Sequence, residues 1–231
     1  MERLIEVDAS AVREPQPLPP PRYAFPHPST ANVFGVVGMG GDFAPETIVD
    51  ACVRGIFPWP HDEEDYLWFS PDPRGILPLE EFHVSRRMRR TLRQGRFHVT
   101  IDRCFDHVLA GCAEREEGTW VTPRYQEAYR RLHELGWAHS FEAWTADGEL
   151  AGGVYGIVVG GYMQAESMFT AVRDGSKAAL TGMMQHLWEQ GFALVDVQVT
   201  SPHVERLGAV SIPREQFLER LATAVALPVR L

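Results

Sequence analysis

Three polar side chains interrupt apolar segments of this sequence and are candidates for chemistry. Asp196 and Gln198 lie two apart in ALVDVQV, so both point to the same face if the segment is a strand. Glu166, in YMQAESMF, follows an apolar run and precedes Met168 and Phe169. Burying a carboxylate or an amide costs free energy unless partners satisfy it. Each residue alone is typical of a structural polar group whose hydrogen bonds are satisfied. The three together favour one polar site whose floor is formed by Met and aromatic side chains.

Two tryptophans offer a second kind of chemistry. Trp59 in IFPWP and Trp120 in REEGTW are either core residues or platforms on which a nucleobase stacks. The signatures of a phosphate-binding loop, a zinc-protease helix and a serine-hydrolase elbow are missing. His133 and His139 lack a second ligand at useful spacing, so we predict no metal and no cofactor.

Positive charge gathers in one short segment, VSRRMRRTLRQGR at residues 84–96, although the chain has 22 basic and 31 acidic residues and a net charge of −9. Ser85 is a suitable N-cap for a helix beginning at Arg86. At about 100° per residue, the apolar side chains share one face: Val84, Met88 and Leu92. The opposite face carries arginines, with Arg87 and Arg89 on its flanks: Arg86, Arg90 and Arg93. This face is either simply solvated or binds the phosphate backbone of a nucleic acid.

The composition is that of a globular protein, with 45 % hydrophobic and 23 % charged residues in 231. No stretch approaches the ~20 apolar residues that cross a bilayer, and the acidic N-terminus lacks the features of a signal peptide. Three cysteines without paired spacing indicate a reducing compartment. We therefore expect a cytoplasmic protein with no membrane contact.

The elements that must position these residues follow from turn and cap signals. Proline-rich residues 15–28 predict an extended arm. We expect helices at 45–54, from 86 onward, from 123 to before Gly136, and at 177–190 with Ser176 as N-cap; two short helices close the chain. We expect strands at 67–77 with a turn at SPDP, at 97–102 and at 193–199, and an antiparallel meander from 141 onward. The fold class is α/β (α+β), with an N-terminal arm and small domain at 1–100 and a catalytic domain at 101–231.

Eight motifs occur in an order and spacing that resemble a known family: RGIFPW, WFSPDPRGIL, HVSRRMRR, REEGTWVT, YRRLHELGWAHSFE, GGVYG, ESMF and DVQV. The chain resembles a leucyl/phenylalanyl-tRNA–protein transferase. The resemblance implies transfer of Leu or Phe, with Met as a further candidate, from aminoacyl-tRNA to proteins with N-terminal Arg or Lys, which marks them for N-degron proteolysis. It also implies a C-terminal domain like the acyl-CoA N-acyltransferases, with a mixed, mainly antiparallel sheet flanked by helices. We expect a monomer.

The resemblance also assigns roles to residues. Asp196, Gln198 and Glu166 are implied to be catalytic, with Asp196 orienting the Gln198 amide and Glu166 meeting the acceptor. The aminoacyl-adenosine site falls on Trp59, Trp120, Tyr129, Val154, Met163 and Met168. The tRNA contact falls on Arg86, Arg87, Arg90 and Arg93.

Two other functions compete with this one. An acyl-CoA-dependent N-acyltransferase would cradle pyrophosphate on [RQ]-x-x-G-x-[GA], and the corresponding stretch RDGSKAAL lacks that spacing. A non-catalytic RNA-binding module would use only the arginine segment and leave Asp196, Gln198 and Glu166 without a purpose.

Overall fold

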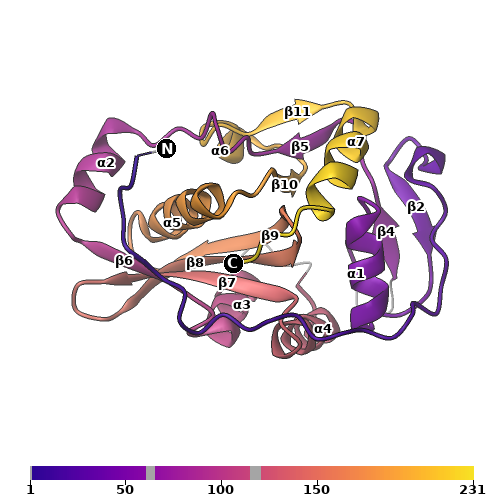
Figure 1. Ribbon diagram of the computed structural model, residues 1–231, viewed down its shortest axis with the longest axis horizontal. Helices are drawn as coiled ribbons and strands as arrows, with labels where there is room; N and C mark the ends of the chain where they lie inside the picture. Colours follow the sequence, from indigo (N-terminus) through magenta and orange to yellow (C-terminus); the bar gives the residue numbers. More distant parts are fainter. Residues whose placement is uncertain (1, 61–65, 115–120) are drawn as a thin grey trace.

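The computed structural model describes residues 2–60, 66–114 and 121–231, and its largest element is an eight-stranded sheet in the order β1-β6-β7-β8-β9-β10-β5-β11 (Figure 1). The centre is the expected antiparallel meander, of β7 (Ala138–Thr145), β8 (Leu150–Val159) and β9 (Tyr162–Thr170). On one side lie β6 (Phe97–Ile101) and, parallel to it, β1 (Val7–Asp8). On the other side lie β10 (Leu194–Gln198), parallel to β9, then β5 (Arg74–Ile76) and β11 (Val210–Ile212). The predicted mixed, mainly antiparallel sheet is confirmed.

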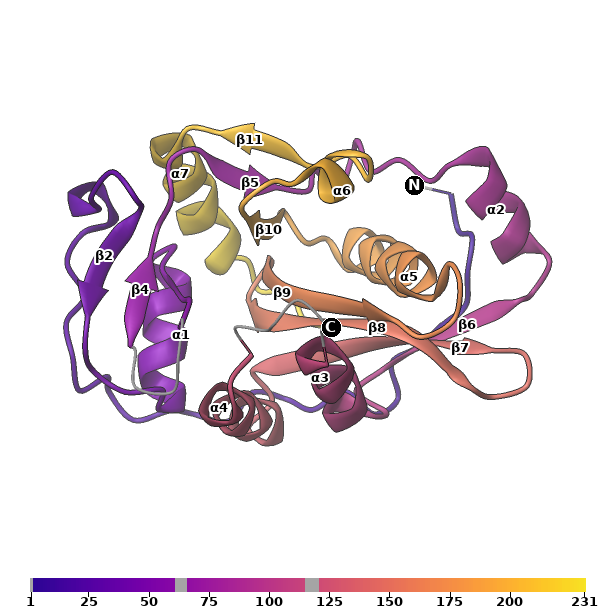
Figure 2. The same ribbon diagram turned by 180° about the vertical axis from the view of Figure 1, so that it is seen from behind.

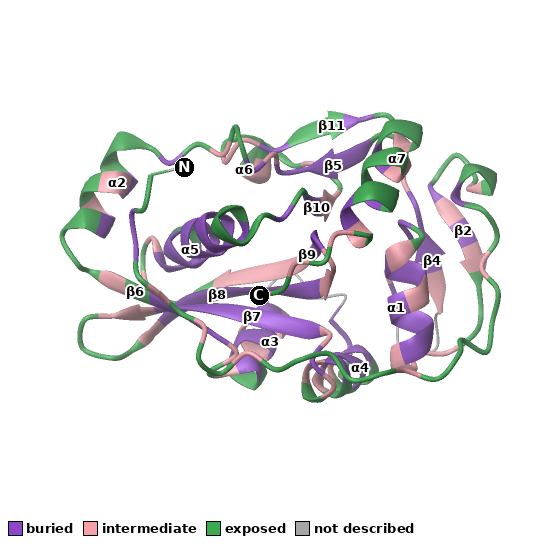
Figure 3. Cartoon of the chain, in the orientation of Figure 1, coloured by how far each residue is buried: buried purple, intermediate pink, exposed green. Residues whose placement is uncertain are grey.

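Helices cover both faces of this sheet, as Figure 2 shows from behind. One face carries α5 (Gly175–Gln190), which packs against β6, β7 and β8. The other carries α3 (Phe105–Ala113) and α4 (Pro123–Glu134). The expected N-cap of α5 was wrong, because the helix begins at Gly175 after Asp174, and the Ser176 hydroxyl instead accepts a hydrogen bond from Thr170. Figure 3 shows the buried residues of the sheet and of the helices that cover its two faces.

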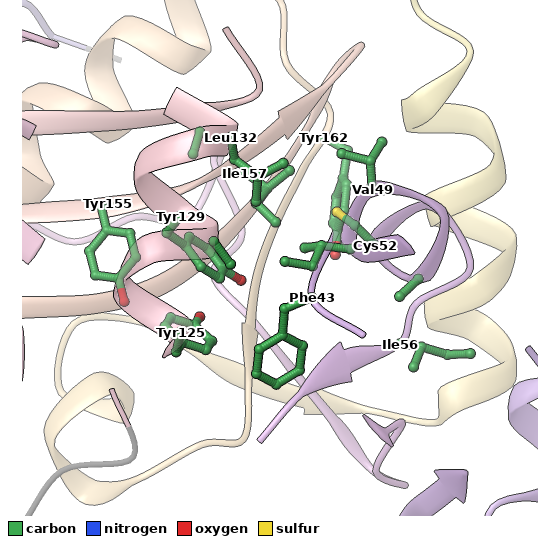
Figure 4. Packing of buried hydrophobic residues seen from close by; sticks show 14 of the residues in the cluster. Phe43, Val49, Cys52, Ile56, Tyr125, Tyr129, Leu132, Tyr155, Ile157 and Tyr162 are labelled. Carbon is green, nitrogen blue, oxygen red and sulfur yellow. The ribbon is translucent and has the colours of Figure 1, made fainter. Parts of the chain in front are cut away.

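A smaller three-stranded sheet lies beside the large one. It consists of β2 (Val36–Met39), β4 (Leu67–Phe69) and β3 (Phe57–Pro58), and α1 (Pro45–Val53) packs between it and the rest of the chain. In Figure 4, Phe43, Cys52 and Ile56 from this region meet Tyr125 and Tyr162 from the large-sheet region in one hydrophobic cluster. β1 and β5 come from residues before 100 but belong to the large sheet, so the two sheets do not divide at residue 100. The domain division at that residue stays a prediction.

Residues 67–77 do not form one folded-back strand. The turn at SPDP is present, but it sends β4 into the small sheet and β5 into the large one. This segment therefore ties the two sheets together. Sequence periodicity could not reveal it, because both halves are short and apolar.

The remaining elements lie at the edges. The arm is extended up to a short 3-10 helix at Pro28–Thr30, and it is held where Trp137 Nε1 donates to the carbonyl of Gln16 at 2.9 Å. The chain closes with α6 (Pro202–Glu205) and α7 (Arg214–Val225). The arginine segment forms α2 (Arg86–Arg93). Within the described residues, no helix is long and apolar enough to span a membrane.

Candidate active site

A cleft opens where the two parallel strands β9 and β10 separate. They are paired only from Tyr162–Leu194 to Gln164–Asp196. Beyond that point the strands diverge, and a cleft of about 510 Å³ lies between their ends. Glu166 from β9 and Gln198 from β10 both line it. Two of the three predicted polar residues therefore face one cavity.

Each strand carries a β-bulge at the cleft, and each bulge redirects a side chain. On β9, Ser167 pairs with Tyr155 and Ala165 pairs with Gly156, which leaves Glu166 as the additional residue. Such an insertion bends a strand and changes the direction of its side chain. The position opposite tolerates only glycine, since a Cβ on Gly156 would lie 2.2 Å from the carbonyl oxygen of Gln164. The bulge thus aims Glu166 at the cleft.

The bulge on β10 lies between Asp196, which pairs with Ile76, and Gln198, which pairs with Gly75. Gln198 has the left-handed backbone conformation, with φ at +58°. The Asp196 carboxylate accepts a hydrogen bond from the backbone N–H of Gln198, with 2.9 Å between Oδ1 and N. Asp196 therefore holds the main chain of Gln198 and not its amide, and simple strand alternation does not describe the pair.

Asp196 also forms an ion pair that sequence reasoning missed. Arg74 on β5 donates from Nε to Oδ1 at 2.8 Å and from Nη2 to Oδ2 at 2.6 Å, and both side chains are 0 % exposed. The guanidinium lies between the rings of Phe57 and Phe217, 4.8 and 4.5 Å from their centres. Its Nη1 donates to the Gly55 carbonyl. The only feature of the sequence that could have indicated this ion pair is an arginine at the start of the otherwise apolar segment RGIL.

Polar contacts lead from Asp196 to Glu166. Tyr162 donates its hydroxyl to Asp196 Oδ2 at 2.6 Å and lies 3.2 Å from Gln164 Oε1. Gln164 Nε2 and the Tyr129 hydroxyl each donate to Glu166 Oε1 at 2.7 Å. The two carboxylates thus share one buried polar network, as the sequence had suggested for one polar site.

Desolvation raises the pKa of Glu166 to about 7, although the hydrogen bonds from Gln164 and Tyr129 partly oppose the shift. The carboxyl therefore changes charge near neutral pH. A cationic ligand at this position would stabilise the ionised form. Glu166 is suited to bind a positive group in the cleft.

Gln198 presents an unsatisfied amide to the same cleft. Its Nε2 is buried and has no hydrogen-bond partner among the residues that the structure describes. Buried polar groups without partners are rare and need an explanation. A ligand in the cleft would supply the missing partner.

A smaller apolar pocket of about 100 Å³ adjoins the cleft and shares Glu166, Met168 and Gln198 with it. Val154 lines this pocket as predicted, together with Leu77 and Leu180. Its size and lining suit a hydrophobic side chain. Met163 lies in the hydrophobic core at 0 % exposure, paired with Val195 of β10, and its role in binding stays a prediction.

The predicted aromatic residues have different surroundings. Trp59 lines the cleft beside Phe57 and Pro58. Tyr129 is fully buried, stacks on Tyr125 at 4.1 Å and supports Glu166 from behind. Trp120 lies outside the described residues.

The arginine helix α2 has the predicted form. Ser85 accepts a hydrogen bond from the Met88 N–H, and Met88 and Leu92 are buried. Of the four arginines predicted to contact tRNA, Arg87 pairs with Asp174 and Arg93 with Glu2. Arg86 and Arg90 are exposed and form no ion pair within the part of the chain that the structure describes. These two guanidiniums are the freest to take an external anion.

Comparison with known proteins defines the class as aminoacyl-tRNA-dependent protein transferases. Residues 76–222 match the family profile of the leucyl/phenylalanyl-tRNA protein transferase, and residues 41–72 match the profile of its N-terminal domain. This chain belongs to the leucyl/phenylalanyl-tRNA–protein transferase family.

Curated relatives with that name span nearly the same length. The protein of Magnetococcus marinus is 44 % identical over 89 % of this chain and 90 % of its own. That of Anaeromyxobacter dehalogenans is 46 % identical over 89 % of both chains. That of Alkalilimnicola ehrlichii is 43 % identical over 100 % of this chain and 88 % of its own.

Proposed function

We propose that this protein transfers leucine or phenylalanine from aminoacyl-tRNA to the α-amine of an N-terminal Arg or Lys of a protein. The observation that carries the proposal is the cleft itself, in which a carboxylate, an unpartnered amide and an apolar pocket meet. The names of the relatives support the donor. The products would be substrates for N-degron proteolysis in the cytoplasm, where aminoacyl-tRNA is found.

The reaction joins an amine to an activated ester. The amine nitrogen attacks the ester carbonyl, an amide bond forms, and the bond to the ribose oxygen breaks. The amine loses one proton, and the departing ribose oxygen takes up one proton and leaves as a hydroxyl. Because an ester is more reactive than the amide product, positioning supplies most of the catalysis, up to about 7–11 kcal/mol.

Gln198 is suited to positioning and not to strong base catalysis, because an amide oxygen is barely basic. We assign its oxygen to the hydrogen bond from the attacking amine and its free Nε2 to an oxygen of the donor. Asp196 fixes the backbone that carries this amide. Asp196 is therefore a positioning residue.

Glu166 meets the guanidinium or ammonium of the acceptor, because it is the carboxylate that lines the cleft. The apolar pocket beside Val154 and Met168 takes the transferred side chain. Trp59 offers a ring for the terminal adenine at the rim of the cleft. All of these groups come from one chain, so a monomer suffices.

An acyl-CoA-dependent N-acyltransferase is the alternative. One assay separates the two: the protein is incubated with radiolabelled Leu-tRNA or labelled acetyl-CoA and a peptide that begins with Arg. We expect label from Leu-tRNA to appear in the peptide and none from acetyl-CoA. Transfer from acetyl-CoA alone would overturn the proposal.

A further inference from the structure

A third cavity lies between the arginine helix and the cleft. This groove of about 200 Å³ is bordered by Ser85 and Met88 at the start of α2, by Lys177 and Thr181 of α5, and by Arg206 directly after α6. We call it the α5–α6 groove. It touches His203, which also lines the cleft.

The groove is the natural path between the two sites already described. Leu180 and Leu207 line both the groove and the small apolar pocket. Its opposite end reaches the N-terminus of α2, whose exposed Arg86 and Arg90 face solvent. In Figure 1, α6 lies along the upper edge of the molecule between α2 and β11, and α5 runs below it.

The charge of the groove is opposite to that of the protein. Its lining includes Lys177, Arg206, His83 and His203, and among the described residues that line it there is no Asp or Glu. Lys177 is the only lysine of a chain with a net charge of −9. Lys177 and Arg206 are both exposed, and neither forms an ion pair with any residue that the structure describes.

The two cations of the groove also act on His203. Partial burial lowers the pKa of His203, and the positive charges of Arg206 and Lys177 lower it further. Because neither cation has a counter-ion among the described residues, both are available to an anionic ligand.

We propose that the α5–α6 groove binds the phosphates of the single-stranded 3′ end of the aminoacyl-tRNA, with Lys177 and Arg206 as the phosphate contacts. This inference rests on the proposed function. The arginine helix then contacts the paired acceptor stem, the groove guides the unpaired nucleotides, and the cleft receives the terminal aminoacyl-adenosine. Contacts to phosphate position the RNA without reading its sequence.

The test compares two RNA hairpins of identical stem, one with an unpaired ACCA 3′ end and one blunt. Their dissociation constants are measured by fluorescence anisotropy for the wild type and three double variants. Lys177→Gln/Arg206→Gln changes the groove, Arg86→Gln/Arg90→Gln changes the helix, and Arg13→Gln/Arg220→Gln removes two exposed charges elsewhere. Circular dichroism confirms that each variant is folded.

We expect the wild type to prefer the overhang hairpin and the groove variant to lose that preference while it binds the blunt hairpin normally. Loss of two phosphate contacts should reduce the salt slope for the overhang hairpin by about 1.4. The helix variant should weaken both hairpins equally, and the control should resemble the wild type. A groove variant that binds both hairpins like the wild type, or weakens both equally, overturns the inference.

A kinetic comparison separates this inference from the proposed function. With Leu-tRNA as donor, the groove variant should have a raised KM and a normal kcat, whereas a leucyl-adenosine donor should be used as by the wild type. Equal loss on both donors contradicts the groove assignment. If the wild type transfers leucine from neither donor, the proposed function fails, while the hairpin measurements still decide what the groove binds.

Discussion

The backbone N–H of Gln198 donates to the carboxylate of Asp196 at 2.9 Å, while the side-chain Nε2 of Gln198 has no partner among the described residues. Asp196 thus stabilises a left-handed residue and leaves its amide free for a ligand. The ion pair of Asp196 with Arg74 thus supports the backbone of Gln198, while the neutral amide of Gln198 is left to contact a ligand.

Replacing Gln198 should lower activity without lowering stability. We expect Gln198→Ala to reduce kcat by about 10²-fold on every donor, since one positioned hydrogen-bonding group is lost. Gln198→Gly is the matched variant, because glycine adopts a positive φ without strain and should be at least as stable as the wild type. Steady-state kinetics and urea denaturation measure the two effects. Normal kcat in the glycine variant would show that the amide has no catalytic role.

Breaking the buried ion pair should destabilise the fold strongly. Arg74→Met leaves the Asp196 carboxylate without its main partner, and we expect a loss of about 3–5 kcal/mol in the free energy of unfolding. The double variant Arg74→Met/Asp196→Asn should recover part of that loss, because it removes the unpaired charge. Urea denaturation of the single and double variants gives the coupling energy. Additive losses would contradict the pairing.

Acceptor choice should depend on pH through Glu166. The folded-state pKa of about 7 lies above the ordinary value of 4.5, so the carboxyl is neutral below pH 7 and charged above it. We expect the preference for a peptide with N-terminal Arg over one with a neutral first residue to rise between pH 6 and 8. The ratio of the two kcat/KM values is measured, because titration of the α-amine affects both peptides.

The same ionisation has a predicted effect on stability. Because the folded-state pKa is raised, Glu166 contributes stability below pH 4.5 that is lost as pH rises through 7. Glu166→Gln should flatten both profiles: the acceptor ratio becomes low and constant, and this part of the pH dependence of unfolding disappears. An acceptor ratio that still rises with pH in Glu166→Gln would assign the preference to another residue.

The apolar pocket should select the donor by volume. Val154→Phe fills part of a pocket of about 100 Å³ and should penalise Phe-tRNA more than Leu-tRNA. A misfit of one methylene is worth only ~1–3 kcal/mol, so the change in preference should be about 10–200-fold. The acceptor preference serves as the control and should not change. An unchanged ratio of Leu to Phe transfer would place the donor side chain elsewhere.

The bulge that aims Glu166 should depend on the glycine opposite. A Cβ on Gly156 would overlap the Gln164 carbonyl, so Gly156→Ala should cost about 1–3 kcal/mol and lower activity as β8 and β9 shift apart. Gly38→Ala in β2 is the control, because a Cβ there has nothing within 4 Å. Denaturation midpoints and kcat are compared. Equal midpoints for the two variants would show that β9 can relax.

The sequence by itself determined the local elements and the residue types of the site. The cap at Ser85 determined where α2 begins, because capping is a property of adjacent residues. Polar residues inside apolar strands identified Glu166, Asp196 and Gln198, because burial without partners is costly. Eight ordered motifs identified the family, which the comparisons confirm.

Only the tertiary structure decided how those residues meet. Arg74 and Asp196 are 122 positions apart in the sequence, and the residues next to either one do not predict their ion pair. The bulges at Glu166 and between Asp196 and Gln198 arise from pairing with β8 and β5, so they shift side chains in a way that strand alternation cannot predict. The cleft exists because β9 and β10 are paired over a short stretch and then separate, and pairing between distant strands is a property of the whole sheet.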